Sequence, residues 1–305
     1  MFIFKKKPSN VINNLDDFKF NKNTLKGEVI VPGDKSMSQR ALLLGLISIG
    51  RTTIKGILDS EDVYFTMKAI EALGAKVSID NDNQYISVLG VGIGNLVSPK
   101  KPIYMGNSGT GTRLLMGLVA GSNALVTFYG DSSLTERPMD RVLAPLSEMG
   151  AGIVSNFKKK LPITILGARA KGFTLPIKYK LLIPSAQVKS AILLAALTAR
   201  GTSFITETKK SRNYTEKMLS YRGVIINNKR INNKKNIISI DGASLIKSKN
   251  IKVPGDPSSA VFVVVAALIT KKSYIVIENV LYDIFRLKIF YILKKNGCFN
   301  RYFKN

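Results

Sequence analysis

A unit of about 74 residues repeats along this 305-residue chain, and the repetition constrains the fold more than any other feature. Each copy starts with a turn rich in Gly, Ser and Pro, which leads into an apolar helical segment. The four apolar segments begin at Ala41, Leu114, Ala191 and Ala260. A short run typical of a β-strand follows each segment, so every copy predicts a turn, a helix and a strand in that order.

The second half of each unit predicts another helix, which ends at a glycine just before a further strand. The four glycines are Gly74, Gly150, Gly223 and Gly297. Glycine suits a helix C-terminus because it adopts the left-handed conformation without a Cβ clash. Short alternating segments such as Tyr85–Val88 predict half-buried strands. The predicted fold class is α/β, with repeated units of turn, helix, strand, helix, strand and strand.

The amino-acid composition excludes several kinds of site. The chain has no histidine, so acid–base chemistry must come from Lys, Asp, Glu or Tyr. Its single cysteine, Cys298, excludes an internal disulfide and a cysteine-based metal cluster, which fits a reducing compartment. Hydrophobic residues make up 45% of the chain and charged residues 22%, which allows a substantial buried core.

The net charge of +26 raises the question of a nucleic-acid partner. The lysines are scattered, and many lie in stretches rich in Asn, Lys and Ile such as Ile225–Ile238. No motif of an RNA- or DNA-binding protein accompanies them, so we expect no specific nucleic-acid binding. A strongly positive field would instead attract small polyanionic substrates.

Neither a targeting segment nor a membrane span is predicted. Residues Met1–Ile12 turn polar after a few residues and lack the apolar core of a signal peptide. The longest apolar runs, Ala41–Ile49 and Ala260–Ile269, reach about half of the roughly 20 residues that a spanning helix needs. We therefore expect a cytoplasmic protein with no membrane partner.

The turn before the first apolar helix has the features of an anion site. Strand Glu28–Val31 leads into Gly33–Ser36 (Gly-Asp-Lys-Ser), and a helix is predicted over Gln39–Ile49. Unpaired backbone N–H groups and a partial positive charge make a helix N-terminus attractive to anions. Lys35 and Ser36 stand at this start, and Arg40, four residues after Ser36, follows one turn later on the same face. The spacing is not that of a P-loop, because an aspartate stands between the glycine and the lysine.

The turn before the second helix, Gly106–Arg113 (Gly-Asn-Ser-Gly-Thr-Gly-Thr-Arg), is a glycine-rich helix start that lets the backbone approach a ligand. Its glycine spacing differs from that of a dinucleotide fingerprint. Further along, Arg137 stands just before a helix that Pro138 is predicted to open. Two interpretations of Arg137 are equally supported: a ligand-binding cation, or a surface ion pair with Glu136 or Asp140.

The third and fourth turns differ in what they offer a ligand. Pro184–Ser190 (Pro-Ser-Ala-Gln-Val-Lys-Ser) brings a hydroxyl and an amide suited to a neutral polyol ring, and Arg212 adds a cation downstream. Pro254–Ser259 carries no basic residue, so we interpret it as helix capping alone. A Ser or Thr near each helix start is the expected N-cap. Repeat symmetry predicts that the first three turns share an anion site.

Together these segments resemble the family of 5-enolpyruvylshikimate-3-phosphate (EPSP) synthases. The matching motifs occur in the family's order: Gly33–Leu42, Gly106–Arg113, Arg137–Met139, Pro184–Ser190 and Gly255–Ser259. The Ser-Ala-Gln and Gly-Asp-Pro-Ser-Ser segments are similar to the branch that includes glyphosate-tolerant bacterial enzymes. The resemblance runs from Asn23 to Asn279 and fades beyond.

The resemblance implies two domains, each made of three βαβαββ units, that close on the substrates. It implies transfer of the enolpyruvyl group of phosphoenolpyruvate to the 5-hydroxyl of shikimate 3-phosphate, with release of phosphate through a tetrahedral addition–elimination intermediate. No metal or organic cofactor takes part in the family's reaction. Such an enzyme serves the shikimate pathway, which leads to chorismate and the aromatic amino acids.

The resemblance also assigns roles to residues. Lys35 would be the catalytic residue that this chain retains, and it would meet both substrates. Shikimate 3-phosphate would be held by Lys35, Ser36, Arg40, Ser185, Ala186, Gln187 and Arg212. Phosphoenolpyruvate would be held by Lys35, Asn107, Gly109, Arg137 and Gln187. Tolerant relatives carry alanine where this chain has Gly109, which implies that the inhibitor glyphosate would still fit here.

Chains of this family continue well beyond the length seen here. The resemblance implies a complete three-unit domain at residues 34–251 and a partial second domain from residues 1–33 and 252–305. The carboxylates for proton transfer and further phosphoenolpyruvate ligands would lie in the part that is not present, as after an early stop or a frame disruption. We expect a monomer that has lost most of its catalytic activity.

Two alternatives to this assignment stay open. A sister enolpyruvyl transferase that acts on a UDP-sugar has a similar fold but uses a mobile loop with a reactive cysteine, whereas Cys298 stands near the C-terminus. The other alternative is a non-catalytic anion-binding protein, because a partial second domain would not bring in the acid–base groups.

Overall fold

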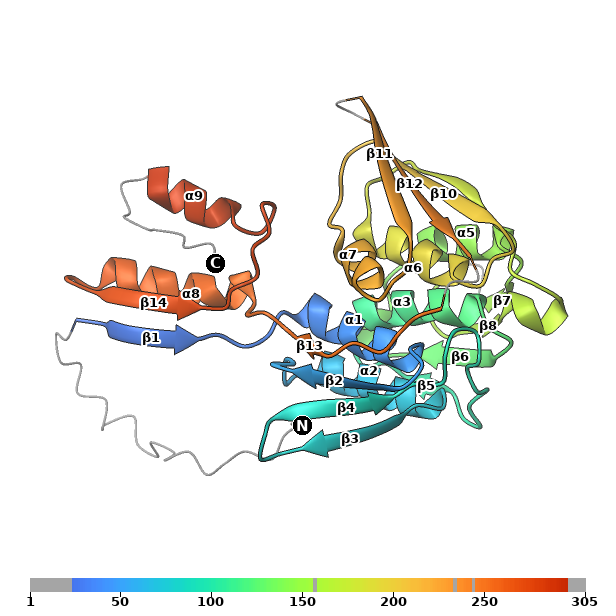
Figure 1. Cartoon of the computed structure of the whole chain (residues 1–305), viewed down its shortest axis with the longest axis horizontal. Helices are drawn as coiled ribbons and strands as arrows, with labels where there is room; N and C mark the ends of the chain where they lie inside the picture. Colours follow the sequence, from blue (N-terminus) through green and yellow to red (C-terminus); the bar gives the residue numbers. More distant parts are fainter. Residues whose placement is uncertain (1–23, 156–157, 233–234, 243–244, 296–305) are drawn as a thin grey trace.

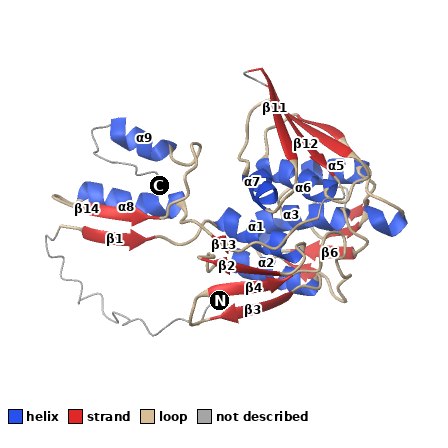
Figure 2. Cartoon of the chain, in the orientation of Figure 1, coloured by secondary structure: helices blue, strands red, loops and turns tan. Residues whose placement is uncertain are grey.

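The structure is a computed structural model, and it describes residues 24–155, 158–232, 235–242 and 245–295 (Figure 1). Helices and strands alternate through the chain, which confirms the predicted α/β class (Figure 2). Gly297 and Cys298, which the sequence analysis singled out, lie outside the described residues. Within the described ranges, no helix is both long enough and apolar enough to cross a membrane.

Most strands belong to three four-stranded sheets of identical topology. Their strands, in spatial order, are β13 (Ile251–Lys252), β2 (Arg51–Lys55), β4 (Tyr85–Leu89) and β3 (Lys76–Asp80); β5 (Ile103–Tyr104), β6 (Leu125–Tyr129), β8 (Ile163–Leu166) and β7 (Gly152–Ser155); and β9 (Lys178–Leu181), β10 (Thr202–Glu207), β12 (Lys235–Asp241) and β11 (Ile226–Asn232). In each sheet the first two strands are parallel and the other neighbours antiparallel. One strand order, used three times, explains the single period of the sequence.

Three helices that are apolar on nearly all sides form the centre of this three-sheet group. They are α1 (Lys35–Leu46), α3 (Gly109–Ala120) and α6 (Ala186–Ala196). The other helices of the group are α2 (Glu61–Ala72), α4 (Ser132–Thr135), α5 (Asp140–Glu148) and α7 (Tyr214–Tyr221), with a 3-10 turn at Ala168–Lys171. One hydrophobic core runs through the three units, because residues of all three inner helices pack in it.

Small residues let α3 and α6 approach each other closely. Gly117 and Gly121 of α3 face Ala191 and Ala195 of α6. A Cβ atom on Gly117 would lie 2.4 Å from the carbonyl oxygen of Ala191, and one on Gly121 would lie 2.8 Å from that of Ala195. Both distances are shorter than van der Waals contact, so the close crossing requires glycine. The contact sets the separation of the two helix starts.

The first sheet takes its edge strand from beyond the third unit. β13 pairs in parallel with β2, and Ile251 lies opposite Ile54. β1 (Lys26–Ile30) precedes the first helix in sequence, but it pairs in parallel with β14 (Tyr274–Glu278) in a separate two-stranded sheet. α8 (Pro257–Ile269) and α9 (Lys288–Lys295) accompany this small sheet at one end of the molecule (Figure 1). The chain therefore crosses twice between the two groups of elements.

The two crossing segments run side by side and are joined by one arginine. The Asp34 N–H donates to the Pro254 carbonyl oxygen and the Asp256 N–H to that of Pro32, each at 2.8 Å. Arg286, between β14 and α9, donates to Asp34 Oδ2 at 2.8 Å and also to Asp256 Oδ1. A single guanidinium thus ties the residue before α1 to the residue before α8, and so connects the two groups.

Aspartate, rather than the predicted serine or threonine, caps two of the repeated helices. Asp34 Oδ1 accepts from the Met37 N–H at 2.8 Å, so α1 begins at Lys35, earlier than the predicted start at Gln39. Asp256 caps α8 in the same way. The correction has a simple cause: the serine after Asp34 stands too far into the first turn to reach the free N–H groups.

The predicted C-terminal glycines are confirmed wherever the structure describes them. Gly74, Gly150 and Gly223 have φ values of +106°, +99° and +93° and end α2, α5 and α7. The prediction that Pro138 opens a helix is wrong, because α5 begins at Asp140 after the N-cap Met139. The chain forms the short helix α4 before this point and needs the intervening residues to turn.

Candidate anion-binding site

The starts of α1, α3 and α6 are neighbours that share hydrogen bonds. From α1, Gln39 Nε2 donates to Ser108 Oγ at the start of α3 at 2.6 Å. From α6, Gln187 Nε2 donates to Thr110 Oγ1 in the first turn of α3 at 2.9 Å. The three turns that repeat symmetry predicted to share a ligand therefore lie together, linked by side chains of their own helices.

Arg40 lies in the first two turns of α1 and is 4% exposed. Its Nε donates to Thr215 Oγ1 of α7 at 2.8 Å, its Nη2 to Ser190 Oγ of α6 at 3.2 Å, and its Nη1 to the Ser36 carbonyl oxygen at 3.0 Å. All three acceptors are neutral, so they do not cancel the positive charge. Burial lowers the pKa of Arg40 to about 10, which still leaves the guanidinium charged at neutral pH.

A second cation, Arg212, stands beside Arg40. The guanidinium carbon of Arg40 lies 5.8 Å from the centre of the Tyr214 ring, and that of Arg212 lies 5.9 Å from it. Burial is the largest cause of the lowered pKa of Arg40, and the charge of Arg212 is the second largest. Two like charges that repel each other across one aromatic ring favour a bound anion that offsets the repulsion.

Arg113 and Arg137 form a second cationic pair at the start of α3. Arg113 Nη1 donates to Gln187 Oε1 at 3.0 Å and its Nη2 to the Pro138 carbonyl oxygen at 3.3 Å. Burial lowers the pKa of Arg113, and the charges of Arg137 and Arg141 lower it further. Several cations therefore crowd this helix start, where the partial positive charge of the helix adds to theirs.

The contacts of Arg137 distinguish between the two interpretations that the sequence left open. Its guanidinium donates to Asn107 Oδ1 and, at 3.3 Å, to Ser133 Oγ. Glu136 pairs with Lys160 instead, and in the described part of the chain no carboxylate lies within salt-bridge distance of Arg137. Arg137 is therefore turned toward the start of α3 and is not held in a surface ion pair.

The other residues predicted to bind ligands occupy the first turns of α1 and α6. Lys35 Nζ donates to Asp62 Oδ2 of α2 at 2.9 Å, and the Lys35 side chain is 52% exposed. Ser185 is the N-cap of α6, and Ala186 is its first residue. The ion pair of Lys35 with Asp62 is partly exposed to solvent, so the lysine can turn to a ligand at little cost, because such pairs stabilise weakly.

The site combines two cation pairs, Arg40 with Arg212 and Arg113 with Arg137, at three adjacent helix starts. Across the ranges that the structure describes, none of these four side chains has a carboxylate within salt-bridge distance. Guanidinium groups and helix N-termini are the groups that bind phosphate and carboxylate most strongly. The arrangement is therefore suited to two anionic ligands side by side, and all the predicted residues lie in this region.

The sequence did not predict separate roles in the site for three residues: Arg113, Ser190 and Thr215. Arg113 ends the glycine-rich motif Gly106–Arg113, so the motif itself carried a usable signal. Ser190 likewise ends the motif Pro184–Ser190, whereas Thr215 carried no such signal. Hydroxyl residues are common in helices, and their role here depends on how α6 and α7 meet.

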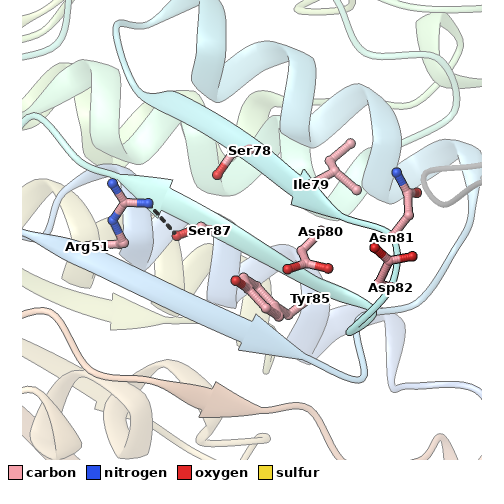
Figure 3. Close-up of a pocket in the computed structure, with 8 residues that line it drawn as sticks. All are labelled: Arg51, Ser78, Ile79, Asp80, Asn81, Asp82, Tyr85 and Ser87. Atoms are coloured by element: carbon pink, nitrogen blue, oxygen red, sulfur yellow. Dashed lines mark hydrogen bonds between the residues drawn. The ribbon is translucent and has the colours of Figure 1, made fainter.

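A surface hollow of about 570 Å³ lies elsewhere, on the first sheet (Figure 3). It is lined by Arg51, Ser78, Ile79, Asp80, Asn81, Asp82, Tyr85 and Ser87. Ile54 and Ile86 on the opposite face of the same strands are buried in the core, so the hollow opens away from the helix starts. No group of Asp, Glu or Cys side chains arranged to hold a metal ion occurs among the described residues.

Comparison with known proteins identifies relatives along nearly the whole chain. Residues 20–301 match the protein family described as EPSP synthase (3-phosphoshikimate 1-carboxyvinyltransferase). The match continues past Asn279, where the motif-based resemblance was expected to fade. The chain is 44% identical over 273 residues to a 3-phosphoshikimate 1-carboxyvinyltransferase of Novosphingobium aromaticivorans, and 46% identical over 279 residues to one of Nitrobacter winogradskyi.

Both alignments cover 90% of this chain, but only 61% and 62% of the two relatives. The chain thus spans about three fifths of the length of the curated relatives that it matches. Among solved structures, the EPSP synthase from Acinetobacter baumannii at 2.37 Å has a TM-score of 0.81 and 38% sequence identity. That alignment covers 90% of this chain and 60% of the Acinetobacter chain.

Proposed function

The chain belongs to the EPSP synthase family, the 3-phosphoshikimate 1-carboxyvinyltransferases, and on this premise we propose that its three helix starts bind shikimate 3-phosphate and phosphoenolpyruvate. The reaction proposed for the complete protein transfers the enolpyruvyl group. The 5-hydroxyl oxygen of shikimate 3-phosphate bonds to the central carbon of phosphoenolpyruvate, and the bond from that carbon to the phosphate oxygen breaks. The hydroxyl gives up its proton as its oxygen bonds, and the methylene carbon takes up a proton to form the tetrahedral intermediate. Phosphate then leaves and the methyl carbon loses a proton, so that overall the hydroxyl proton is passed to the released phosphate.

Shikimate 3-phosphate is assigned to the region around Arg40 and Arg212. Lys35 and Ser36 in the first turn of α1 and Ser185–Gln187 at the start of α6 complete this region. The phosphate and carboxylate of this ligand are the groups that guanidinium side chains and helix N-termini bind best. Arg40 is buried, and its hydrogen bonds to Thr215, Ser190 and Ser36 all go to neutral oxygens, so its charge is suited to a strong charge-assisted contact with a ligand.

Phosphoenolpyruvate is assigned to the region around Arg137, with Asn107 and Gly109. Arg113 adds a charge, and its bond to Gln187 places the α6 amide between the two cation pairs. Lys35 would reach both ligands, which is the catalytic position that the family resemblance gives it. No metal and no organic cofactor is part of this proposal.

One observation carries the assignment. Two pairs of arginines, linked through Gln187 and the helix starts, stand without bonded carboxylates in the described part of the chain. Cations this close would ordinarily be neutralised within the protein unless ligands supply the negative charge. The number of pairs matches the number of anionic substrates.

Calorimetry and a phosphate assay test the proposal. We expect the 305-residue chain to bind shikimate 3-phosphate with one site per chain. This chain spans 62% of the Nitrobacter winogradskyi relative, so we expect phosphate release by the 305-residue chain with both substrates to be far slower than for that relative. Binding of a UDP-sugar in place of shikimate 3-phosphate would contradict the assignment and favour the sister transferase. Turnover close to that of the relative would refute the proposed loss of activity.

Gly109→Ala is expected to weaken phosphoenolpyruvate binding without unfolding the chain. The new Cβ would lie 2.9 Å from Arg137 Nη1 and 3.1 Å from Arg113 Nη1. Both are ends of flexible side chains, so the guanidiniums shift while the backbone stays, and stability changes by less than about 1 kcal/mol. Titration of the shikimate 3-phosphate complex with phosphoenolpyruvate and with glyphosate measures the effect. We expect glyphosate, the bulkier ligand, to lose more affinity; an equal affinity of parent and variant for both ligands would contradict the assignment of this pocket.

The architecture of the family extends the proposal to domains and assembly. We propose that residues 34–251 form a three-unit domain, that residues 1–33 and 252–305 belong to a second one, and that the protein is a cytoplasmic monomer. The strand pairings support this division, because β1 pairs with β14 in the small sheet and β13 pairs with β2 in the first four-stranded sheet. Light scattering of the purified chain decides the oligomeric state.

A further inference from the structure

A buried ion triplet lies directly behind the Arg40 site. Lys189 Nζ lies 2.7 Å from Glu216 Oε1 and 3.1 Å from Glu207 Oε1. The Lys189, Glu216 and Glu207 side chains are 1%, 8% and 1% exposed. Burying such charges is costly, and apolar residues of the same shape usually stabilise a core at least as well. The triplet therefore points to a role beyond stability.

The triplet and the Arg40 contacts are built from the same two helices. Lys189 and Ser190 are consecutive on α6, and Thr215 and Glu216 are consecutive on α7. The helices meet in two adjacent pairs: Lys189 with Glu216, and Ser190 with Thr215, whose hydroxyls lie 2.7 Å apart. The hydroxyl pair accepts the hydrogen bonds of Arg40. A carboxylate therefore stands one residue from a hydroxyl that holds Arg40, yet it is bound to the lysine.

We propose that Lys189 is a positioning residue that sequesters the Glu216 carboxylate, so that the charge of Arg40 stays available to an anionic ligand. The inference rests on the proposed function, because it takes the start of α1 as the site of a phosphorylated anion. Its geometric basis is the side-by-side arrangement of the two pairs on α6 and α7.

Electrostatics shows why sequestration is needed. Glu216 is close enough to Arg40 for its charge to oppose the effects of burial and Arg212 on the pKa of Arg40. Without Lys189, Glu216 would face the like charge of Glu207 in a buried environment. Turning toward Arg40 would relieve this cost. The resulting internal ion pair would compete with the ligand for the same guanidinium.

A purely structural brace between α6 and α7 makes a different prediction. Loss of the brace would displace Thr215 and Ser190, and removing Glu216 as well would not restore their positions. Sequestration instead predicts that the defect caused by losing Lys189 disappears when the Glu216 charge is removed too. The double variant therefore separates the two roles.

The test measures shikimate 3-phosphate binding by calorimetry in Lys189→Met and in the double variant with Glu216→Gln. Lys189→Met is expected to raise the Kd about tenfold, because Arg40 loses much of a charge-assisted contact. The double variant is expected to return to within about threefold of the parent. Lys68→Met is the matched control, because it removes a lysine from a surface pair with Glu71 and changes the net charge equally; its Kd should stay within about twofold.

The outcome is decisive even if one variant does not fold. Lys189→Met leaves two buried carboxylates, Glu207 and Glu216, without their lysine, whereas the double variant leaves only one charged, so the double variant is expected to be the more stable of the two. A double variant that binds tenfold more weakly than the parent would overturn the proposal, whatever Lys189→Met does.

A measurement without ligand separates this inference from the proposed function. In ¹⁵N NMR spectra, the Nε–H resonance of Arg40 is expected to shift in Lys189→Met and to return in the double variant. If the parent does not bind shikimate 3-phosphate, the proposed function fails, while these spectra still show whether Glu216 moves to Arg40. An Arg40 resonance that Lys189→Met leaves unchanged would overturn the inference.

Discussion

Arg40→Met is expected to weaken shikimate 3-phosphate binding by about a hundredfold or more, since removing one partner of a buried charge contact costs about 3–5 kcal/mol. The fold is expected to tolerate the change. Ser190 and Thr215 hydroxyls lie 2.7 Å apart and Ser190 Oγ donates to the Ala186 carbonyl oxygen at 2.6 Å, so neither loses its last partner with Arg40. Methionine fills a similar volume without a charge to bury.

The expected change in stability has the opposite sign to the change in binding. Burial lowers the pKa of Arg40, which means that the fold disfavours this charge. The free energy of unfolding of Arg40→Met should therefore equal or exceed that of the parent. Binding residues commonly reduce the stability of the fold in this way. Arg51→Met, on the outer face of the first sheet, is the control that removes the same charge. Binding by Arg40→Met within tenfold of the parent would place the ligand elsewhere.

Gly117→Ala is expected to destabilise the chain by about 3 kcal/mol or more, because overpacking against a fixed backbone falls at the upper end of such effects. The added methyl would lie 2.4 Å from the carbonyl oxygen of Ala191 and 2.7 Å from its Cα atom. These are backbone atoms of α6 and cannot rotate away, so the two helices must separate. The separation would also move Gln187 from Thr110 and Arg113, and binding of both proposed ligands should fall with stability.

The sign of this prediction makes it informative. In an uncrowded helix, alanine is more favourable than glycine by roughly 0.5–1 kcal/mol. Gly152→Ala in strand β7 is the control for an added methyl group that has room, because its Cβ would lie 3.5 Å from Leu166 Cβ in ordinary contact. Unfolding in urea, followed by circular dichroism, measures both variants. A Gly117→Ala chain as stable as the Gly152→Ala chain would contradict the close crossing of α3 and α6.

Local sequence was sufficient where a residue's role depends on its own backbone. Gly74, Gly150 and Gly223 end helices with positive φ, as their periodic spacing predicted. Other local predictions failed at helix starts. Asp34 caps α1 where a serine was expected, and α5 begins at Asp140 after Pro138. N-terminal boundaries depend on which of several polar side chains reaches the free N–H groups, and this is decided by the path of the preceding loop.

The sequence by itself determined the repeat, the α/β class, the family, and the turns that carry Lys35, Asn107 and Gln187. The tertiary structure decided which of these turns meet. It also revealed that β13 closes the first sheet while β1 pairs with β14, and that Arg286 joins two helix caps. The physical reason is separation along the chain: the Arg40–Thr215 and Arg113–Gln187 contacts join residues 175 and 74 positions apart. The Arg113–Gln187 contact depends on how closely α3 and α6 pack, and the Arg40–Thr215 contact depends on how α1 and α7 meet, which no local pattern specifies.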